Sequence, residues 1–243
     1  MVLAPLLAAP TLMFLASWVE RRLGPAAGGA IAAMPFSIAI IVVSLGADGP
    51  AVAASAAAHV SAQVAFALAF AWVIVRRGGA LGLGAAALAF AAVSLVIALV
   101  PMWVAIACAV PALALKVKGP GPSGSGGRVD ARSGSVVVIG VVGAARLAAD
   151  VFGPGVAGIV AAFPTLSATF VLLLARARGR EAGACALGGL IVGLRGYLAF
   201  CVVVAVTGSV LLGLVGVAAM NLLAARSLNL HVTSPDRRRA AVA

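Results

Sequence analysis

Charged side chains are scarce in this chain. They make up only 9% of its 243 residues, whereas 64% of the residues are hydrophobic. Soluble domains carry roughly 25% charged residues, so this composition excludes a soluble domain and predicts a polytopic membrane protein. The apolar runs do not alternate in polarity, as the strands of a membrane β-barrel would over about ten residues. We therefore expect an all-α integral membrane protein.

Acidic residues and cysteines are rarer still. Asp and Glu total 6 against 17 Lys and Arg, which gives a net charge of +11. Most basic residues occupy short segments between apolar runs, a pattern that orients a membrane protein and does not form a nucleic-acid-binding patch. Cys108, Cys185 and Cys201 stand apart inside apolar runs, so we predict neither a disulfide framework nor a metal site.

Motifs of catalysis are also missing. The sequence contains no Walker A loop, no HExxH motif, no nucleophile with a nearby base and no paired carboxylates. These are the arrangements that phosphoryl transfer, metal-dependent hydrolysis, acyl transfer and acid–base catalysis require. We therefore expect no enzyme activity and no cofactor.

The apolar runs predict nine transmembrane helices. The segment 79–117 is about twice as long as one crossing requires, and Pro101 divides it into two. With nine spans and the N-terminus outside, the basic residues of the connecting segments all fall on one side, which the positive-inside rule assigns to the cytoplasm. The expected spans are 2–20, 26–46, 51–75, 80–99, 101–117, 134–150, 155–175, 182–206 and 209–226.

An internal repeat relates the two halves of the chain. Residues 152–165 align with residues 23–36 at an offset of 129, which places Pro164 on Pro35. An odd number of spans separates equivalent helices, so the copies are expected to be inverted, an arrangement found in many secondary transporters. The predicted units are residues 1–99 as the first four-helix repeat, 100–133 as an extra helix with a Gly/Pro/Ser-rich linker, 134–228 as the second repeat and 229–243 as a disordered cytoplasmic tail.

The second half resembles a known family. The segment FGPGVAGIVAAFPT, followed by GREAGACALGGLIVGLRGYLAF, is similar to the GlpM-like family of small bacterial inner-membrane proteins through Ala157-Gly158 and Phe163-Pro164-Thr165. The first half departs from that pattern, with Met34-Pro35-Phe36 at the equivalent place. The resemblance implies a four-span unit, a bacterial inner-membrane location and a link to envelope or polysaccharide functions, and it implies no defined chemistry.

Three polar residues are expected near the middle of the membrane. Arg195 lies near the centre of the span 182–206, where an arginine costs about 2.5–3.5 kcal/mol and needs a protein or water environment. It could bind an anionic group, pair structurally with an acid such as Asp150, or reach toward the interface. His59 and Gln63 share one face of the span 51–75 and could couple protons or form hydrogen bonds between helices.

Two prolines are expected to break helices at the same depth. Pro35 and Pro164 each lack an N–H and free a carbonyl, which is tolerated in a membrane where a cavity is lined. With Ser37, Thr165 and Ser167, these breaks could form a binding site, or they could be simple kinks. Arg146 and Asp150 lie four residues apart, so they could form an outer gate with a proton-binding acid or a structural ion pair.

These observations favour a secondary transporter or flippase for a small anionic or phosphate-bearing substrate, free or linked to lipid. It would use alternating access between inverted repeats, with His59 or Asp150 as candidate proton-coupling groups. It would act in the membrane lipid as a monomer or homodimer, without nucleic acid. The alternative is a membrane scaffold for envelope polysaccharide or lipid assembly. A water-accessible cavity at mid-membrane that touches Arg195 would favour the transporter.

Overall fold

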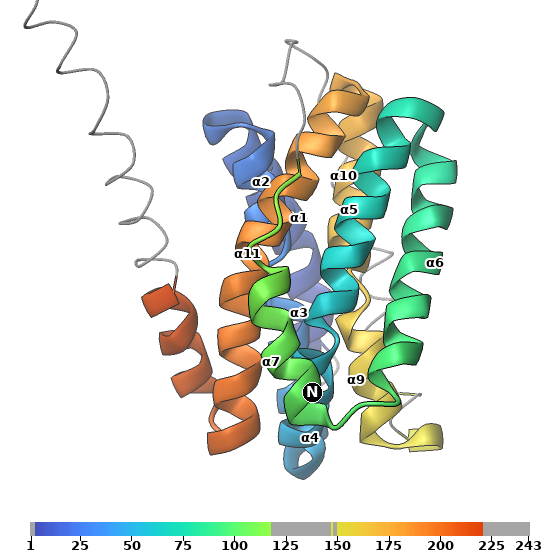
Figure 1. Cartoon of the computed structure of the whole chain (residues 1–243). Coiled ribbons are helices and arrows are strands. Elements are labelled where there is room, and N and C mark those ends of the chain that lie inside the picture. The colour runs from blue at the N-terminus through green and yellow to red at the C-terminus, as the bar shows by residue number, and fades with distance from the viewer. Residues whose placement is uncertain (1–2, 118–146, 148–149, 221–243) are drawn as a thin grey trace, which may run out of the picture.

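The computed structural model describes residues 3–117, 147 and 150–220, and the regular elements among these residues are all helical (Figure 1). A short 3₁₀ turn, Gly46–Asp48, joins α3 to α4. The α-helices are α1 (Leu3–Leu23), α2 (Pro25–Ala32), α3 (Phe36–Leu45), α4 (Gly49–Ala58), α5 (Val60–Arg77), α6 (Gly79–Ile97), α7 (Met102–Ala112), α9 (Pro154–Ala162), α10 (Thr165–Arg178), α11 (Arg180–Thr207) and a final helix, Val210–Met220.

The outer surface of the bundle is apolar. Leu81, Leu88 and Leu95 recur every seventh residue along α6 and are 64%, 73% and 69% exposed. A continuous stripe of exposed leucines is unfavourable in water and suits the hydrocarbon of a bilayer. By length and composition, five stretches of the described helices can cross a membrane: Pro25–Ala58, Val60–Arg77, Gly79–Ile97, Pro154–Arg178 and Arg180–Thr207.

Basic residues gather at one end of the bundle. Helices α1, α5 and α10 finish at the upper end in Figure 1, where α11 begins. At that end the guanidinium carbon of Arg22 lies 5.0 Å from the ring centroid of Trp18, and that of Arg76 lies 4.6 Å from that of Trp72. Trp side chains are enriched at membrane–water interfaces, and stacked Trp–Arg pairs suit this location. The other arginines at this end are Arg21, Arg77, Arg176, Arg178 and Arg180.

Two helices are interrupted at proline. Between α2 and α3 the N–H of Phe36 donates to the Met34 carbonyl at 2.8 Å, and between α9 and α10 the N–H of Thr165 donates to the Phe163 carbonyl at 2.8 Å. Both are tight turns around a proline, which cannot continue the hydrogen-bond pattern of a helix. In Figure 1 the pair α2–α3 descends, whereas the pair α9–α10 ascends.

Glycine permits the closest helix contacts. A Cβ at Gly29 of α2 would collide with the backbone of Ala186 on α11. In the same contact, a Cβ at Gly189 of α11 would collide with the Ala26 carbonyl of α2. On α9, a Cβ at Gly158 would lie 2.6 Å from Ser55 Oγ of α4. Small residues let membrane helices approach in this way. The α2–α11 contact lies toward the basic end and the α4–α9 contact toward the opposite end (Figure 1).

The helices differ from the expected spans in two places. The spans at 26–46 and 155–175 are interrupted at Pro35 and Pro164, as expected, but that at 51–75 is also divided, at His59 between α4 and α5. The span expected at 101–117 ends at Ala112, after Pro111 in its last turn, with turn-like bonds from the N–H groups of Ala114 and Leu115. Most of the span 134–150, the linker and the tail lie outside the described residues, and the last span is described as far as Met220.

Candidate functional site

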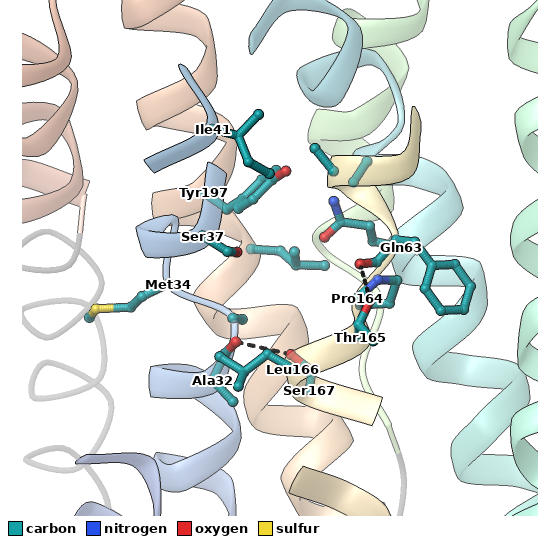
Figure 2. Close-up of a pocket in the computed structure, with 15 residues that line it drawn as sticks. Ala32, Met34, Ser37, Ile41, Gln63, Pro164, Thr165, Leu166, Ser167 and Tyr197 are labelled. Carbon is teal, nitrogen blue, oxygen red and sulfur yellow. Dashed lines mark hydrogen bonds between the residues drawn. The ribbon is translucent and has the colours of Figure 1, made fainter. Parts of the chain in front are cut away.

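A small cavity lies where the two interrupted helices cross. It has a volume of about 40 Å³ and lies against both proline breaks (Figure 2). Helices α5 and α11 complete its wall. The lining residues are Ala32, Ala33, Met34, Ser37, Ile41, Gln63, Ala161, Ala162, Phe163, Pro164, Thr165, Leu166, Ser167, Leu194 and Tyr197.

Hydroxyl groups connect the two interruptions. Ser167 Oγ on α10 donates to the carbonyl of Ala32, the last residue of α2, at 3.1 Å. Thr165 Oγ1 donates to the Phe163 carbonyl at 3.2 Å. Figure 2 shows both bonds at the edge of the cavity. The Ser167 bond satisfies a carbonyl that the end of α2 leaves free, and it holds the two broken helices together.

Two buried polar side chains face each other across the cavity. Gln63 is 3% exposed and Tyr197 is 5% exposed. They point toward one another in Figure 2, yet neither Gln63 Nε2 nor Tyr197 Oη has a partner with hydrogen-bond geometry among the described residues. A buried polar atom without a well-formed hydrogen bond is costly, so water or a ligand in the cavity would stabilise both side chains, in addition to the contacts of the Tyr197 hydroxyl with Gln63 and Cys201. About 40 Å³ holds roughly three water molecules.

Helix ends of both polarities meet at this cavity. Helices α3 and α10 begin here, and α2 and α9 end here, so two positive and two negative dipole ends lie close together. The N–H groups of Phe36 and Thr165, at the starts of α3 and α10, donate to the Met34 and Phe163 carbonyls. The remaining N–H groups and the hydroxyls at the site can hold a small polar or anionic group.

The structure brings together five of the predicted site residues. Ser37, Gln63, Pro164, Thr165 and Ser167 all line the cavity. Pro35 forms the turn beside it without being a lining residue. Tyr197 was not anticipated, although it is the only tyrosine in the chain and lies in the middle of an apolar span, which could have drawn attention to it.

Arg195 lies in a different place. Its side chain is in a groove of about 440 Å³, whereas its neighbours Leu194 and Tyr197 on α11 line the central cavity. Its Nη2 donates to the Leu113 carbonyl at 3.3 Å, just beyond the end of α7. Successive residues of a helix point about 100° apart, so α11 presents different residues to the two spaces. The structure does not bring Arg195 and Gln63 into one pocket.

The remaining predicted residues lie away from the cavity lining. His59 is 5% exposed at the junction of α4 and α5, with Nδ1 at 2.7 Å from the Ser55 carbonyl. Ser55 Oγ in turn donates to the Gly155 carbonyl at 2.8 Å, which ties α4 to α9. Asp150 is exposed before α9, and Arg146 lies outside the described residues, so their pairing stays a prediction. Within the described part, no three His, Cys, Asp or Glu side chains form a group that could hold a metal ion.

The apolar exterior and the five long apolar stretches of helix fit the class of all-helical membrane proteins. Comparison with protein-family models, curated proteins and solved structures found no match to the chain. The resemblance to the GlpM-like family therefore stays a prediction.

Proposed function

We propose that this protein is a secondary transporter of a small anionic solute, which binds in the central cavity between two inverted repeats. The observation that carries the proposal is the cavity at the crossing of two broken helices. Gln63 Nε2 and Tyr197 Oη are buried there and make no hydrogen bond of good geometry among the described residues, although the Tyr197 hydroxyl lies near Gln63 and Cys201. Transporters with inverted repeats bind their substrates at such helix breaks near mid-membrane.

The helix boundaries support an inverted repeat. An offset of 129 places the starts of α2 and α3 on those of α9 and α10, and an offset of 130 places the end of α5 on that of α11. Gly24 and Gly153 precede the first pair with φ of 92° and 84°, a region that favours glycine. The opposite directions of α2–α3 and α9–α10 in Figure 1 fit this relationship.

Alternating access would follow from the glycine contacts. The α2–α11 contact at Gly29 would close the basic end, and the α4–α9 contact at Gly158 would close the opposite end. Both contacts are tight in this structure, on either side of a cavity of about 40 Å³. Rocking one repeat against the other would open one contact at a time. Gly29 and Gly158 are equivalent positions of the repeat, so the contacts at the two ends would each depend on a glycine at the same place.

Charge supports an orientation. The basic end of the bundle would face the cytoplasm of a bacterial inner membrane, and the end carrying Asp48 and Asp150 would face outward. This orientation is the one that the positive-inside rule predicts from the sequence, with the N-terminus outside and the C-terminus inside. A monomer suffices for the mechanism, because both repeats belong to one chain.

Anion flux into proteoliposomes tests the proposal. The purified chain is reconstituted and assayed with chloride, nitrate, acetate and inorganic phosphate, against protein-free vesicles. Gln63→Leu should lower the flux of the transported anion by about tenfold to a hundredfold, because a hydrogen bond to a charged group contributes roughly 1.5–3 kcal/mol. Ser94→Ala is the matched control, because Ser94 is also a buried polar residue but lies on α6 outside the cavity lining. Flux equal to that of empty vesicles for every anion would reject the proposal.

A scaffold for envelope assembly is the second candidate. Two features of the cavity favour it: its small volume, about 40 Å³, admits few solutes as it stands, and its lining does not include Arg195, as expected for the transporter. A scaffold does not need to open, so locking the two halves together would leave its activity intact. A transporter would lose its activity under the same treatment.

A further inference from the structure

A buried histidine adjoins the α4–α9 contact, which we name the outer gate because the proposed mechanism opens and closes it. His59 separates α4 from α5 and is 5% exposed. Its Nδ1 lies 2.7 Å from the Ser55 carbonyl, and the Ser55 hydroxyl donates to the Gly155 carbonyl of α9 at 2.8 Å. Ser55 therefore connects the imidazole of His59 directly to the outer gate.

The hydrogen bond to Ser55 assigns the form of the imidazole. A carbonyl oxygen can only accept, so Nδ1 of His59 donates and carries the hydrogen of the neutral ring. Nε2 then has a free lone pair, and it is buried without a hydrogen-bond partner among the described residues. A proton on Nε2 would create a buried charged donor with no acceptor, which is costly. The closed gate therefore suits the neutral ring, and a protonated ring needs the water that an open gate would admit.

The surroundings of His59 supply no counter-charge to a protonated ring. The elements packed against α4 and α5 are α3, α6, α7, α9, α11 and the 3₁₀ turn, and of these α3, α6 and α9 contain no ionisable side chain. The ionisable side chains of the others are Asp48, Cys108, Arg180, Glu181, Cys185, Arg195, Tyr197 and Cys201. The acids at the outer end, Asp48 and Asp150, are exposed, and no described carboxylate forms an ion pair with the ring.

The ring also lies close to the central cavity. Ser55, His59 and Gln63 are four residues apart, and backbone bonds from His59 N to Ser55 O and from Gln63 N to His59 O keep the helical spacing through the break. His59 is therefore one turn, or about 6 Å, from Gln63, which lines the cavity. An offset of 130 places Gly189 at the equivalent position of α11, so the contact at the basic end has no ionisable side chain there.

We infer that His59 binds a proton that crosses together with the anion, and that its protonation opens the outer gate. Nε2 would accept one proton from outside, so the ring would gain one positive charge beside the cavity that receives the anion. A monovalent anion brings one negative charge, so the two ions would cross without net charge. Both would leave on the cytoplasmic side when the α2–α11 contact opens. The inference rests on the proposed transport and adds its coupling ion.

Proton movement with the anion tests the coupling. The purified chain is reconstituted in vesicles that contain a pH-sensitive dye, and chloride, nitrate or inorganic phosphate is added outside. The lumen of wild-type vesicles should become acidic as the anion enters. With one-to-one coupling, an outside solution more acidic by one pH unit should raise the accumulation of chloride or nitrate up to about tenfold.

Two variants assign the coupling to the ring. His59→Gln keeps a polar side chain that cannot bind a proton in this pH range, so it should lose both the acidification and the response to the pH gradient. Ser94→Ala, the control for anion flux, should keep both, because Ser94 lies on α6 outside the cavity lining. Coupling that persists in His59→Gln would overturn the inference.

The protonation of the ring can also be observed without transport. In a chain with His231→Gln, His59 is the sole histidine, and ¹⁵N NMR of labelled histidine reports its tautomer and charge. The ring should be the neutral Nδ1–H tautomer at pH 8, and the imidazolium should appear as the pH falls to 5, the range in which histidine titrates. This measurement leaves His59 unchanged, so it remains decisive if His59→Gln fails to fold.

The outcomes distinguish this inference from the proposed transport. A ring that stays neutral at pH 5, or wild-type anion flux that moves no protons, would overturn the inference and leave anion transport standing. Wild-type flux equal to that of empty vesicles for every anion would instead reject the proposed transport, and the inference with it.

Discussion

Arg178 Nη1 lies 2.9 Å from Glu20 Oε1, and this ion pair joins the end of α10 to the end of α1. The two side chains are not equally buried, because Glu20 is 1% exposed and Arg178 is 21% exposed. Glu20 also packs under α2, since a Cβ at Gly28 would lie 2.6 Å from the Glu20 Cβ. The pair therefore fixes three helices at the basic end of the bundle.

The unequal burial predicts unequal effects of removing each partner. Arg178→Gln leaves a buried carboxylate with Arg21 as its remaining nearby cation and should cost about 3 kcal/mol of stability. Glu20→Gln leaves an arginine that can reach water and should cost about 1 kcal/mol. Thermal unfolding in detergent checks the order. The double variant should be more stable than Arg178→Gln alone, and the exposed Arg176→Gln is the control. Equal losses from the two single variants would contradict this account of the pair.

The α2–α11 contact predicts that alanine is not tolerated at Gly29. A Cβ there would collide with the backbone of Ala186, which cannot move as a side chain could. Gly29→Ala should lower the Tm sharply or prevent recovery of folded protein, and Gly189→Ala should do the same against Ala26. Gly84→Ala is the matched control on α6, because a Cβ at Gly84 has no atom within 4 Å. That change should raise the stability by up to about 1 kcal/mol, through helix propensity.

Local chemistry explains which parts of the fold could be predicted. Pro35 and Pro164 cannot continue a helix, and Gly24 and Gly153 supply the backbone angles before the next helix, so these breaks and starts follow from residue type. The cavity residues beside the breaks, such as Ser167, could be expected for the same reason. The depth of these residues in the membrane follows from the number of residues that separate them from the end of their span.

The placement of Arg195 could not be obtained in this way. Counting residues gives the depth of a side chain but not the direction in which it points around the helix. That direction depends on which neighbours cover each face. Leu194 and Arg195 are adjacent in sequence, yet one lines the cavity and the other the groove. Nor did hydropathy reveal that α7 ends at Ala112, since the residues up to Leu115 are equally apolar.

Cysteine labelling tests the proposed orientation. In a chain whose three native cysteines are replaced by alanine, Ala47→Cys places a thiol on the exposed turn between α3 and α4. Arg77→Cys places one at the exposed end of α5, at the opposite end of the bundle. A membrane-impermeant maleimide should label position 47 in intact cells and position 77 only after permeabilisation. Labelling of both in intact cells would contradict the assignment of the basic end to the cytoplasm.

Ser167 and Tyr197 line the same cavity and should respond in opposite ways to loss of the hydroxyl. Ser167 Oγ donates to Ala32 O at 3.1 Å, so Ser167→Ala should cost about 1 kcal/mol. Tyr197 Oη lies near Gln63 and Cys201 but makes no bond of good hydrogen-bond geometry among the described residues. Tyr197→Phe should therefore leave the Tm unchanged or raise it, because it removes a buried polar atom that is poorly satisfied. The same change should lower anion flux, since the poorly satisfied hydroxyl is a group that the proposed substrate would bind. A large loss of Tm in Tyr197→Phe would show that the hydroxyl serves the fold, and unchanged flux would remove Tyr197 from the site.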